Sequence, residues 1–389
     1  MSKIMLQIHL ISPYHGGSHK AWAEGWQKSS QHSVTLHTLP DRFWKWRMHG
    51  GAITLARRFL AQTAQPDLLI ATDMLDLTTF LALTRQNTGQ IPTAVYMHEN
   101  QLTYPLPQDG RTGPMRRQLG ERDRHYAFIN VASMLAADQV FFNSRYHLES
   151  FFTALPNFLR HFPEYNELNA VARLRKKSTV LPVGIDFDRL SQENELQKPN
   201  RTPLILWNQR WEYDKNPKAF FAALYAAAEA GRPFEVALCG QQYGKRPSIF
   251  NKAVKKLGDR IVHVGHADLP TYRRLLWQAD ITISTAHHEF FGISILEAIG
   301  CHTFPLLPNR LSYPELLPDL YHEACLYQSE EELAAKLVWA LTNQEQVQEI
   351  GQALATAVSA YSWQHISPVY DKAMQKLHQS SVAHTSENP

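Results

Sequence analysis

The sequence predicts an α/β protein of two doubly wound, Rossmann-like domains that face a central cleft. Short apolar runs alternate with amphipathic segments almost throughout, which is typical of βα units and a mostly parallel sheet. A polar stretch interrupts this alternation once, at residues 188–202. The 389 residues also exceed the roughly 250 to 300 that a single hydrophobic core usually serves.

The first half of the chain is expected to hold one parallel sheet. Helical periodicity lies between its apolar runs, for example over 125–138 and 146–155. We therefore assign residues 1–187 to a first domain and 188–202 to a linker. The expected strands cover residues 3–12, 33–39, 66–73, 92–99, 139–144 and 178–184.

The second half repeats this pattern and predicts a second domain over residues 203–362. Strands are expected at 203–209, 234–240, 260–265, 280–286, 301–307 and 324–328, with helices over 218–231, 271–279, 292–300 and 331–343. The helical pattern over 363–379 has no strand left to cross over to, so we expect it to pack back on the first domain. Residues 380–389 lack periodicity and are predicted to be disordered.

Composition narrows the function classes. The formal charge of +3 does not indicate a general nucleic-acid binder, so RNA contacts would have to come from local clusters. Cys239, Cys301 and Cys325 form no CxxC pair, which argues against a zinc site or disulfides and predicts a cytoplasmic protein. No stretch approaches the ~18 consecutive apolar residues of a membrane span, and we interpret the apolar start as a strand.

The loop "HHEFFGISILEAIG" is the first candidate site, because ligands of open α/β sheets bind at the carboxyl ends of strands. A helix is expected to begin near Ile293, which would leave the amides of Phe291, Gly292 and Ile293 as donors for an anion such as diphosphate. Glu297 could accept hydrogen bonds from a sugar diol. Glu289, which precedes the helix, would lie beside the group that is attached to the other end of the diphosphate. Alternatively, both acids only stabilise the helix dipole, by ~0.3 to 1 kcal/mol each.

Two cations follow the first strand of the second domain, in "WNQRWEYDKNP". Arg210 and Lys215 could neutralise a diphosphate leaving group, one through its fork geometry and one as a point charge. The alternative is that both are solvated loop charges.

Together these four residues resemble the retaining nucleotide-sugar glycosyltransferases of the GT-B fold, large family 4 (GT4). The resemblance implies that Arg210 and Lys215 bind the diphosphate, that Glu289 contacts the donor sugar and that Glu297 holds the nucleotide ribose.

Four further blocks carry a closer resemblance. "ISPYHGGSHKAWAEGW", "HTLPDRFWKWRMHGGA", "MHENQLTYP" and "WNQRWEYDKNP" are similar to the tRNA-queuosine mannosyltransferase branch of that family. The resemblance implies transfer of mannose from GDP-mannose to the cyclopentenediol of queuosine, at the wobble position of a tRNA(Asp), with retention at the anomeric carbon. Gln209 and Asn216 depart from the wider family, which usually has glycine before the arginine and after the lysine.

The first domain supplies candidates on the other side of the expected cleft. His98 matches a family histidine that faces the donor sugar. Gly16 and Gly17 would let backbone approach the donor phosphates, or else form a tight strand-to-helix turn. The remaining candidates are Gly240, Val264 and Gly265 for the nucleotide base, and His15, Ser18 and His19 for the acceptor.

Two segments are rich in basic residues, and in the first of them aromatic side chains alternate with the basic ones. Single-stranded nucleic acid is bound by such a combination of positive charge and stacking aromatic rings, and each stacked base contributes ~1 to 3 kcal/mol. The alternative is an amphipathic helix edge and ordinary loop charges. The candidates are Arg42, Trp44, Lys45, Trp46 and Arg47, next to Phe43, and then Arg111, Arg116 and Arg117.

No metal or other cofactor is expected. Asp186 and Asp188 mimic a DxD metal signature, but they stand at the entrance to the linker and read as a turn. No carboxylate nucleophile is evident, so we expect front-face substitution in which the leaving phosphate helps to deprotonate the acceptor. Two alternatives stay open: the same transferase class with a glycan, lipid or small-molecule acceptor, and a non-catalytic nucleotide-sugar or RNA-binding module.

Overall fold

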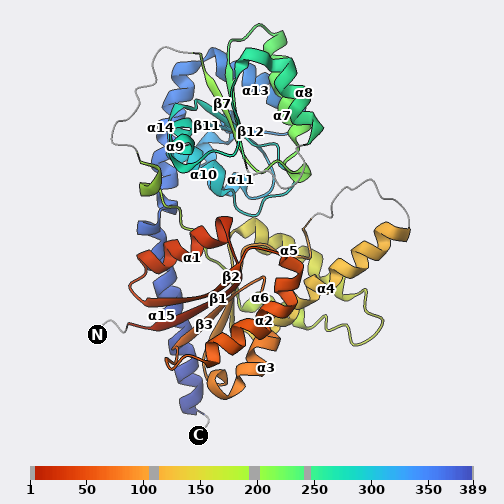
Figure 1. The fold of residues 1–389 in the computed structure, drawn as a ribbon, viewed down its shortest axis with the longest axis vertical. Helices are drawn as coiled ribbons and strands as arrows, with labels where there is room; N and C mark the ends of the chain where they lie inside the picture. The colour runs from red at the N-terminus through yellow and green to blue at the C-terminus, as the bar shows by residue number, and fades with distance from the viewer. Residues whose placement is uncertain (1–4, 105–113, 192–201, 241–246, 388–389) are drawn as a thin grey trace. The chain divides into compact units, whose positions relative to one another are not determined.

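The protein, seen in a computed structural model, forms two compact units (Figure 1). Unit 1 comprises Met1–Gly184 and Trp363–Pro389, and unit 2 comprises Ile185–Ser362. The structure describes residues 5–104, 114–191, 202–240 and 247–387, without the side chains of 114–123 and 382–387.

Unit 1 is built on six parallel strands in the order β2-β1-β3-β4-β5-β6. Strands β3 and β4 are buried along their whole length, as expected where helices cover both faces of a parallel sheet. The strands are β1 (Gln7–His15), β2 (Ser33–Pro40), β3 (Leu68–Thr72), β4 (Thr93–Met97), β5 (Gln139–Phe142) and β6 (Ser178–Val180). The helices are α1 (Gly17–Ser29), α2 (Trp44–Leu60), α3 (Leu77–Thr88), α4 (Pro114–Ala136), α5 (Arg145–Leu159), α6 (Ala170–Lys176) and α15 (Trp363–Glu387).

Unit 2 repeats this architecture with the strand order β12-β11-β10-β7-β8-β9. Its strands are β7 (Leu204–Asn208), β8 (Glu235–Cys239), β9 (Ile261–Gly265), β10 (Ile281–Ile283), β11 (Phe304–Pro308) and β12 (Leu326–Tyr327). Its α-helices are α7 (Pro217–Glu229), α8 (Ser248–Leu257), α9 (Leu269–Gln278), α10 (Ile293–Gly300), α11 (Tyr313–Leu316), α12 (His322–Cys325), α13 (Glu330–Thr342) and α14 (Gln344–Val358). Short 3-10 turns are η1 (Asp188–Leu190), η2 (Tyr213–Lys215), η3 (Gly258–Arg260), η4 (Asp319–Tyr321) and η5 (Ser359–Tyr361).

Each sheet has one point at which the strand order reverses. In unit 1 the chain goes from β1 outward to β2 and then returns to β3, so β1 and β3 are neighbours. In unit 2 it goes from β7 to β8 and β9 and then returns to β10, beside β7. Loops that follow two such neighbours diverge, which leaves a crevice at their carboxyl ends.

The last helix, α15, packs on unit 1. The Tyr370 hydroxyl accepts a hydrogen bond from Trp22 Nε1 (2.8 Å) and donates to the Pro182 carbonyl (2.9 Å). Ser30 Oγ donates to Asp371 Oδ1 (2.6 Å). The helix runs on to Glu387, so the prediction of a disordered tail from residue 380 is wrong over that range.

Each of the twelve predicted apolar runs overlaps one of the twelve strands in the described ranges, although β1, β2 and β11 extend one to three residues beyond the prediction, and the prediction of two Rossmann-like domains is confirmed. The linker prediction is wrong at its start, because η1 packs on unit 2: Leu190 is buried, and its carbonyl accepts a hydrogen bond from Trp277 Nε1 (2.8 Å). Residues 192–201 lie outside the described part of the chain.

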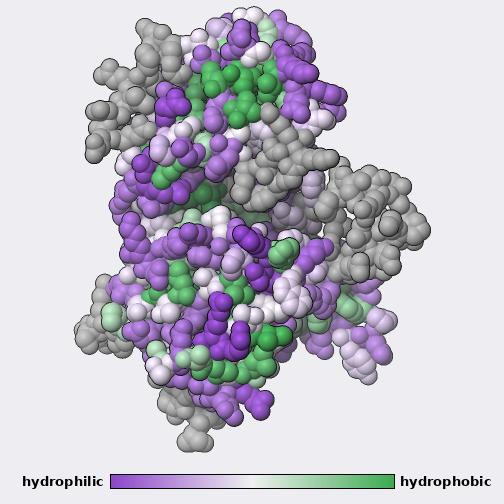
Figure 2. All heavy atoms as spheres, viewed as in Figure 1, coloured by the Kyte–Doolittle hydropathy of each residue, from purple (hydrophilic) through white to green (hydrophobic). Residues whose placement is uncertain are grey.

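The surface in view is mainly hydrophilic. Figure 2 shows apolar residues gathered in separate small patches among polar ones. Within the ranges that the structure describes, no helix is long and apolar enough to cross a membrane.

Candidate active site

Arg210, Lys215 and Glu289 lie in the loops after β7 and β10, the neighbouring strands at which the strand order of unit 2 reverses. The loop after β7 carries both cations, and the loop after β10 carries the glutamate. Hydrogen bonds tie the loops together: His287 N donates to the Asp214 carbonyl (2.7 Å), and Thr285 Oγ1 lies 2.8 Å from the Lys215 carbonyl. Residues far apart in the sequence therefore meet at one edge of the sheet.

Asn216 explains one departure from the resembled family. It adopts a left-handed conformation (φ 47°, ψ 59°) at the N-cap of α7, and its side chain accepts from Ala219 N (3.4 Å). Asparagine is among the few residues besides glycine that visit this conformation readily. The loop thus keeps the backbone that glycine would allow.

Gln209, the other departure from the resembled family, is buried. Its backbone carbonyl lies so close to residue 240 that only glycine fits there. A Cβ on Gly240 would lie 2.1 Å from the Gln209 carbonyl oxygen. Gly240 N also donates to the Gly265 carbonyl (3.2 Å), and both glycines have positive φ. Gly240, Gly265 and the partly exposed Val264 thus lie together at the ends of β8 and β9, on the same sheet edge as Arg210.

Lys215 is buried and fully engaged. Its Nζ donates to the His288 carbonyl (2.8 Å) and to Glu289 Oε2 (3.2 Å), and Asp214 Oδ2 lies 3.3 Å away. Arg210, by contrast, is more exposed and lies 3.5 Å from Glu212 Oε2. One cation is therefore held inside the loop, and the other extends toward solvent.

Charge keeps the Glu289 carboxylate ionised. Burial alone would raise the pKa of Glu289, but Lys215, then His288 and Arg210, bring that pKa below its ordinary value. Burial and the charge of Lys215 lower the pKa of His288 to about 4, so this imidazole is neutral at pH 7.

Helix α10 begins at Ile293, after Gly292 in a left-handed conformation (φ 108°). The amides of Gly292 and Ile293 stand at its N-terminus, where backbone N–H groups have no acceptor within the helix. The prediction is wrong for Phe291, because its amide donates to Glu289 Oε1 (3.4 Å) and its ring is buried.

Glu297 is buried one turn into α10, and two donors orient its carboxylate. Arg189 Nη2 donates to Oε1 (2.6 Å), and the Tyr272 hydroxyl donates to Oε2 (2.8 Å). Asn208 Nδ2 in turn donates to the Tyr272 hydroxyl (3.2 Å). Burial raises the pKa of Glu297, while Arg189 opposes that rise. Sequence reasoning missed Arg189, Tyr272 and Asn208.

Unit 1 has its own polar cluster, centred on His98 after β4. Asp73 Oδ1 accepts from His98 N (3.0 Å), and Asn143 Nδ2 donates to the His98 carbonyl (2.8 Å). The His98 ring lies 4.3 Å from that of His19 and 4.5 Å, edge to face, from that of Trp22. The sequence analysis missed Asp73 and Asn143, although both are polar residues placed directly after strands.

His98 is neutral because of this environment. Burial, and then the charges of His19 and His147, hold its pKa well below the ordinary value, and its Nε2 has no hydrogen-bond partner among the described residues. Burial, followed by the charge of Glu99, raises the pKa of Asp73 well above its usual range. An uncharged imidazole with a free ring nitrogen can exchange hydrogen bonds with a hydroxyl group.

Contacts and backbone conformation within unit 1 explain why glycine occupies both positions of the Gly16-Gly17 turn. A Cβ on Gly16 would lie 2.0 Å from Asp41 Oδ2, and Gly17 has a φ of +51°. These facts favour the tight-turn alternative, and contact with donor phosphates stays a prediction. Among the acceptor candidates, His19 is buried, Ser18 is exposed, and His15 Nε2 lies 3.4 Å from Glu24 Oε1.

Segment 42–47 opens α2, where Phe43 and Trp46 are exposed and Trp44 is half-buried. Arg42 and Lys45 are exposed, and Arg47 Nε donates to the Pro40 carbonyl (3.1 Å). Arg111 lies outside the described residues. The side chains of Arg116 and Arg117, in the first turns of α4, are not described either.

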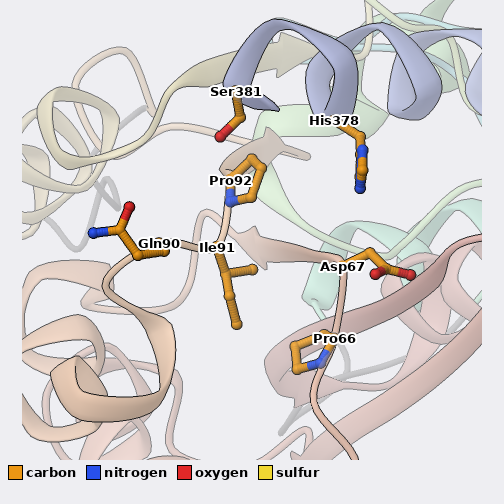
Figure 3. A pocket seen from close by; sticks show the side chains of 7 residues that line it. All are labelled: Pro66, Asp67, Gln90, Ile91, Pro92, His378 and Ser381. Atoms are coloured by element: carbon orange, nitrogen blue, oxygen red, sulfur yellow. The ribbon is translucent and has the colours of Figure 1, made fainter. Parts of the chain in front are cut away.

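A cavity of about 340 Å³, shown in Figure 3, is lined by residues of unit 1 alone. It is at the amino ends of β3 and β4, opposite to the edge where ligands of such sheets bind. It contains none of the predicted site residues. Its lining residues are Pro66, Asp67, Gln90, Ile91, Pro92, His378 and Ser381.

The Asp186 carboxylate accepts from Arg189 N (3.0 Å), which is a turn contact. In the described part of the chain, no three His, Cys, Asp or Glu residues are grouped in a way that could hold a metal ion.

Comparison with known proteins adds an independent line of evidence. A family model described as tRNA-queuosine alpha-mannosyltransferase N-terminal matches residues 7–185, and one described as Glycosyl transferases group 1 matches residues 188–355. A tRNA-queuosine alpha-mannosyltransferase from Drosophila melanogaster is 33% identical over 345 residues, which cover 87% of each chain.

Two other proteins are less similar. A GDP-mannose:cellobiosyl-diphosphopolyprenol alpha-mannosyltransferase from Xanthomonas oryzae pv. oryzae (strain PXO99A) is 25% identical over 206 residues, 52% of each chain. The structure of Anabaena HepE in complex with UDP and glucose covers 95% of this chain and all of that one, with a TM-score of 0.67 and 14% identity. The predicted GT-B fold class is confirmed by these similarities.

Proposed function

Because the chain belongs to the tRNA-queuosine alpha-mannosyltransferase family of glycosyltransferases, we propose that it transfers mannose from GDP-mannose to queuosine at the wobble position of a tRNA(Asp), with retention at the anomeric carbon. The observation that carries the proposal is the 33% identity over 87% of the chain. A GDP-mannose donor is also named for the Xanthomonas relative. Cys239, Cys301 and Cys325 are buried and form no disulfide, which suits a cytoplasmic enzyme.

The Lys215–Glu289 pair is the point at which we propose that the donor binds. Lys215 Nζ already has three close oxygen partners, because it donates to the His288 carbonyl and to Glu289 Oε2 and lies 3.3 Å from Asp214 Oδ2 in an ion pair, so we expect a phosphate oxygen to displace one of them. Glu289 is the acceptor that can leave, because its side chain is 24% exposed whereas that of Asp214 is 2% exposed. The mannose hydroxyls then donate to Glu289 while the diphosphate takes Lys215. Arg210 and the amides of Gly292 and Ile293 add charge and donors on the same side.

Glu297 would hold the ribose of GDP. A carboxylate offers about four lone-pair sites, and Arg189 and Tyr272 each use one, so capacity remains for both hydroxyls of a ribose diol. Arg189 also offsets part of the cost of burying this charge. Residues near Gly240, Val264 and Gly265 would meet the base.

The proposed reaction is a front-face substitution. The bond from the anomeric carbon to the phosphate oxygen breaks, a bond from that carbon to the acceptor oxygen forms on the same face, and the acceptor proton passes to the leaving phosphate. Lys215 and Arg210 stabilise the negative charge that develops on the phosphate, so no metal ion or other cofactor takes part in the proposal. Neutral His98 would hydrogen-bond to a mannose hydroxyl.

Transfer of radiolabelled mannose tests the function. We expect label from GDP-mannose to enter queuosine-containing tRNA(Asp) and not the same tRNA without queuosine. Equal labelling of both tRNAs would contradict the proposal. One observation favours a second candidate, a polyprenol-linked glycan acceptor, which is named for the Xanthomonas relative. Labelling of such a lipid, with tRNA unlabelled, would support that candidate instead.

A further inference from the structure

Two aromatic side chains stand exposed at the start of α2. Phe43 is 79% exposed and Trp46 is 63% exposed. Phe43 also adopts a left-handed conformation (φ 52°, ψ 54°), which is unfavourable for a residue other than glycine. Since its ring gains no burial in return, contacts with a partner are a physical reason to keep it there.

The indole of Trp46 lies over Gly50, one turn further along α2. A Cβ on Gly50 would be 2.6 Å from Trp46 Cζ2 and 2.7 Å from Cε2. The absence of a side chain at Gly50 therefore lets the ring rest against the helix, and more than half of its surface remains open to solvent.

Trp44 is different, because it anchors α2 to α4. Its ring centroid lies 5.3 Å from that of Tyr126, and both rings pack beside the buried Met48. Lys45 Nζ lies 5.3 Å from the Trp44 ring and 5.4 Å from the Tyr126 ring. The rings of His49 and His125 stack with centroids 4.9 Å apart.

These contacts join two segments that the sequence presents separately. Residues 42–49, which lead into and begin α2, and residues 125–126 of α4 form one surface, and Figure 1 shows the two helices side by side. Exposed cations flank the two open rings: Arg42 precedes Phe43, and Lys45 lies between the rings in sequence. Positive charge beside open aromatic faces suits a single-stranded nucleic acid.

We propose that Phe43 and Trp46, which we call the α2 platform, stack on unpaired bases of the anticodon loop of the acceptor tRNA. Arg42 and Lys45 hold the adjacent phosphates, and Trp44 positions the platform without touching RNA. The inference rests on the proposed function, because it takes tRNA as the acceptor. It goes further by assigning different roles to aromatic residues that are neighbours in the sequence.

The test is binding of a fluorescent anticodon stem-loop RNA, measured by anisotropy, together with mannose transfer to full-length tRNA. We expect Phe43→Ala and Trp46→Ala each to weaken RNA binding by about 5- to 100-fold, as expected for the loss of one stacked base. The KM for tRNA rises by a similar factor, with kcat at saturating tRNA and the affinity for GDP-mannose unchanged. Lys45→Ala should make the dependence of binding on salt less steep.

Two further variants separate stacking from a structural role. Gly50→Ala adds a methyl group where the Trp46 indole lies, so this variant should bind RNA more weakly. Its Tm should be maintained or raised, because alanine has a higher helix propensity than glycine. Leu320→Ala removes an apolar side chain that is 81% exposed and belongs to unit 2, outside the platform, so this variant should bind RNA like the wild type.

Wild-type RNA affinity in both Phe43→Ala and Trp46→Ala would overturn the platform and leave the proposed function intact. If the wild type itself neither binds the stem-loop nor labels tRNA, the proposed function fails as well. Binding of the wild type to anionic vesicles or to a protein through these two rings, in place of RNA, would also overturn the inference.

Discussion

Lys215 Nζ lies 3.2 Å from Glu289 Oε2, although 73 residues separate the two in the sequence. They meet because β7 and β10 are neighbours at the point where the strand order of unit 2 reverses. The charge of Lys215 helps to hold the pKa of Glu289 below its ordinary value, so this carboxylate is ionised before any ligand arrives. In the proposed reaction the diphosphate binds to Lys215, and the mannose hydroxyls donate hydrogen bonds to Glu289.

Lys215→Ala should therefore reduce both stability and activity. The change leaves Asp214 and Glu289 without their cation, and removal of one partner of a buried ion pair costs about 3 to 5 kcal/mol. Urea unfolding measures the loss of stability, and the KM for GDP-mannose measures the loss of donor binding. Lys218→Ala, an exposed lysine three residues away, is the matched control and should change neither quantity. Equal effects of the two variants would contradict this role.

The pH dependence of stability should differ in sign between the two glutamates. The pKa of Glu289 is below its ordinary value of 4.5, so its contribution to stability is complete above pH 4.5 and is lost as the pH falls through the lowered pKa. The pKa of Glu297 is raised, so its ionised form costs stability, and that cost disappears as the pH falls through the raised pKa.

Urea unfolding of Glu289→Gln and Glu297→Gln, over about pH 7 to pH 3.5, tests this difference. As the pH falls, the stability of the wild type relative to Glu289→Gln should decrease, and its stability relative to Glu297→Gln should increase. Trends of the same sign for both variants would show that the electrostatic environments are assigned wrongly.

Arg189→Gln should weaken donor binding through Glu297. The guanidinium donates to the Glu297 carboxylate at 2.6 Å and is 40% exposed, so a charge-assisted bond of about 1.5 to 3 kcal/mol, discounted for solvent, predicts a rise of several-fold in the KM for GDP-mannose. The KM for tRNA should not change. Arg274→Gln, at an exposed position on the neighbouring helix α9, is a suitable comparison. A change in kcat alone would argue against an effect on the ribose site.

Tyr370→Phe should destabilise unit 1. The substitution removes the acceptor of the buried Trp22 indole N–H, and an unsatisfied buried group costs about 1 to 3 kcal/mol. Trp22 also touches the ring of His98, so we expect kcat to fall together with Tm. Tyr361→Phe removes a hydroxyl that bonds to the Glu315 carbonyl at the surface and should cost much less. Equal losses of Tm in the two variants would contradict the prediction.

The sequence predicted the strands well because each is a short apolar run, and parallel strands buried on both faces show this pattern strongly. It also predicted the loops of Arg210, Lys215 and Glu289, since each of these loops directly follows a strand. Arg189 was missed because its partner, Glu297, lies 108 residues further along the chain. Its own segment is polar enough to resemble a linker. The amide of Phe291 was predicted incorrectly because a side chain two residues away caps it, which depends on a rotamer that the sequence does not specify.

Mass analysis of the wobble nucleoside tests the central claim most directly. Queuosine-containing tRNA(Asp) is incubated with GDP-mannose and the wild type or Glu289→Gln, then digested to nucleosides. The account predicts that the wild type converts queuosine to a product heavier by one hexose and that Glu289→Gln does so far more slowly. Queuosine left unchanged by the folded wild type, or a hexose found on a different nucleoside, would contradict it.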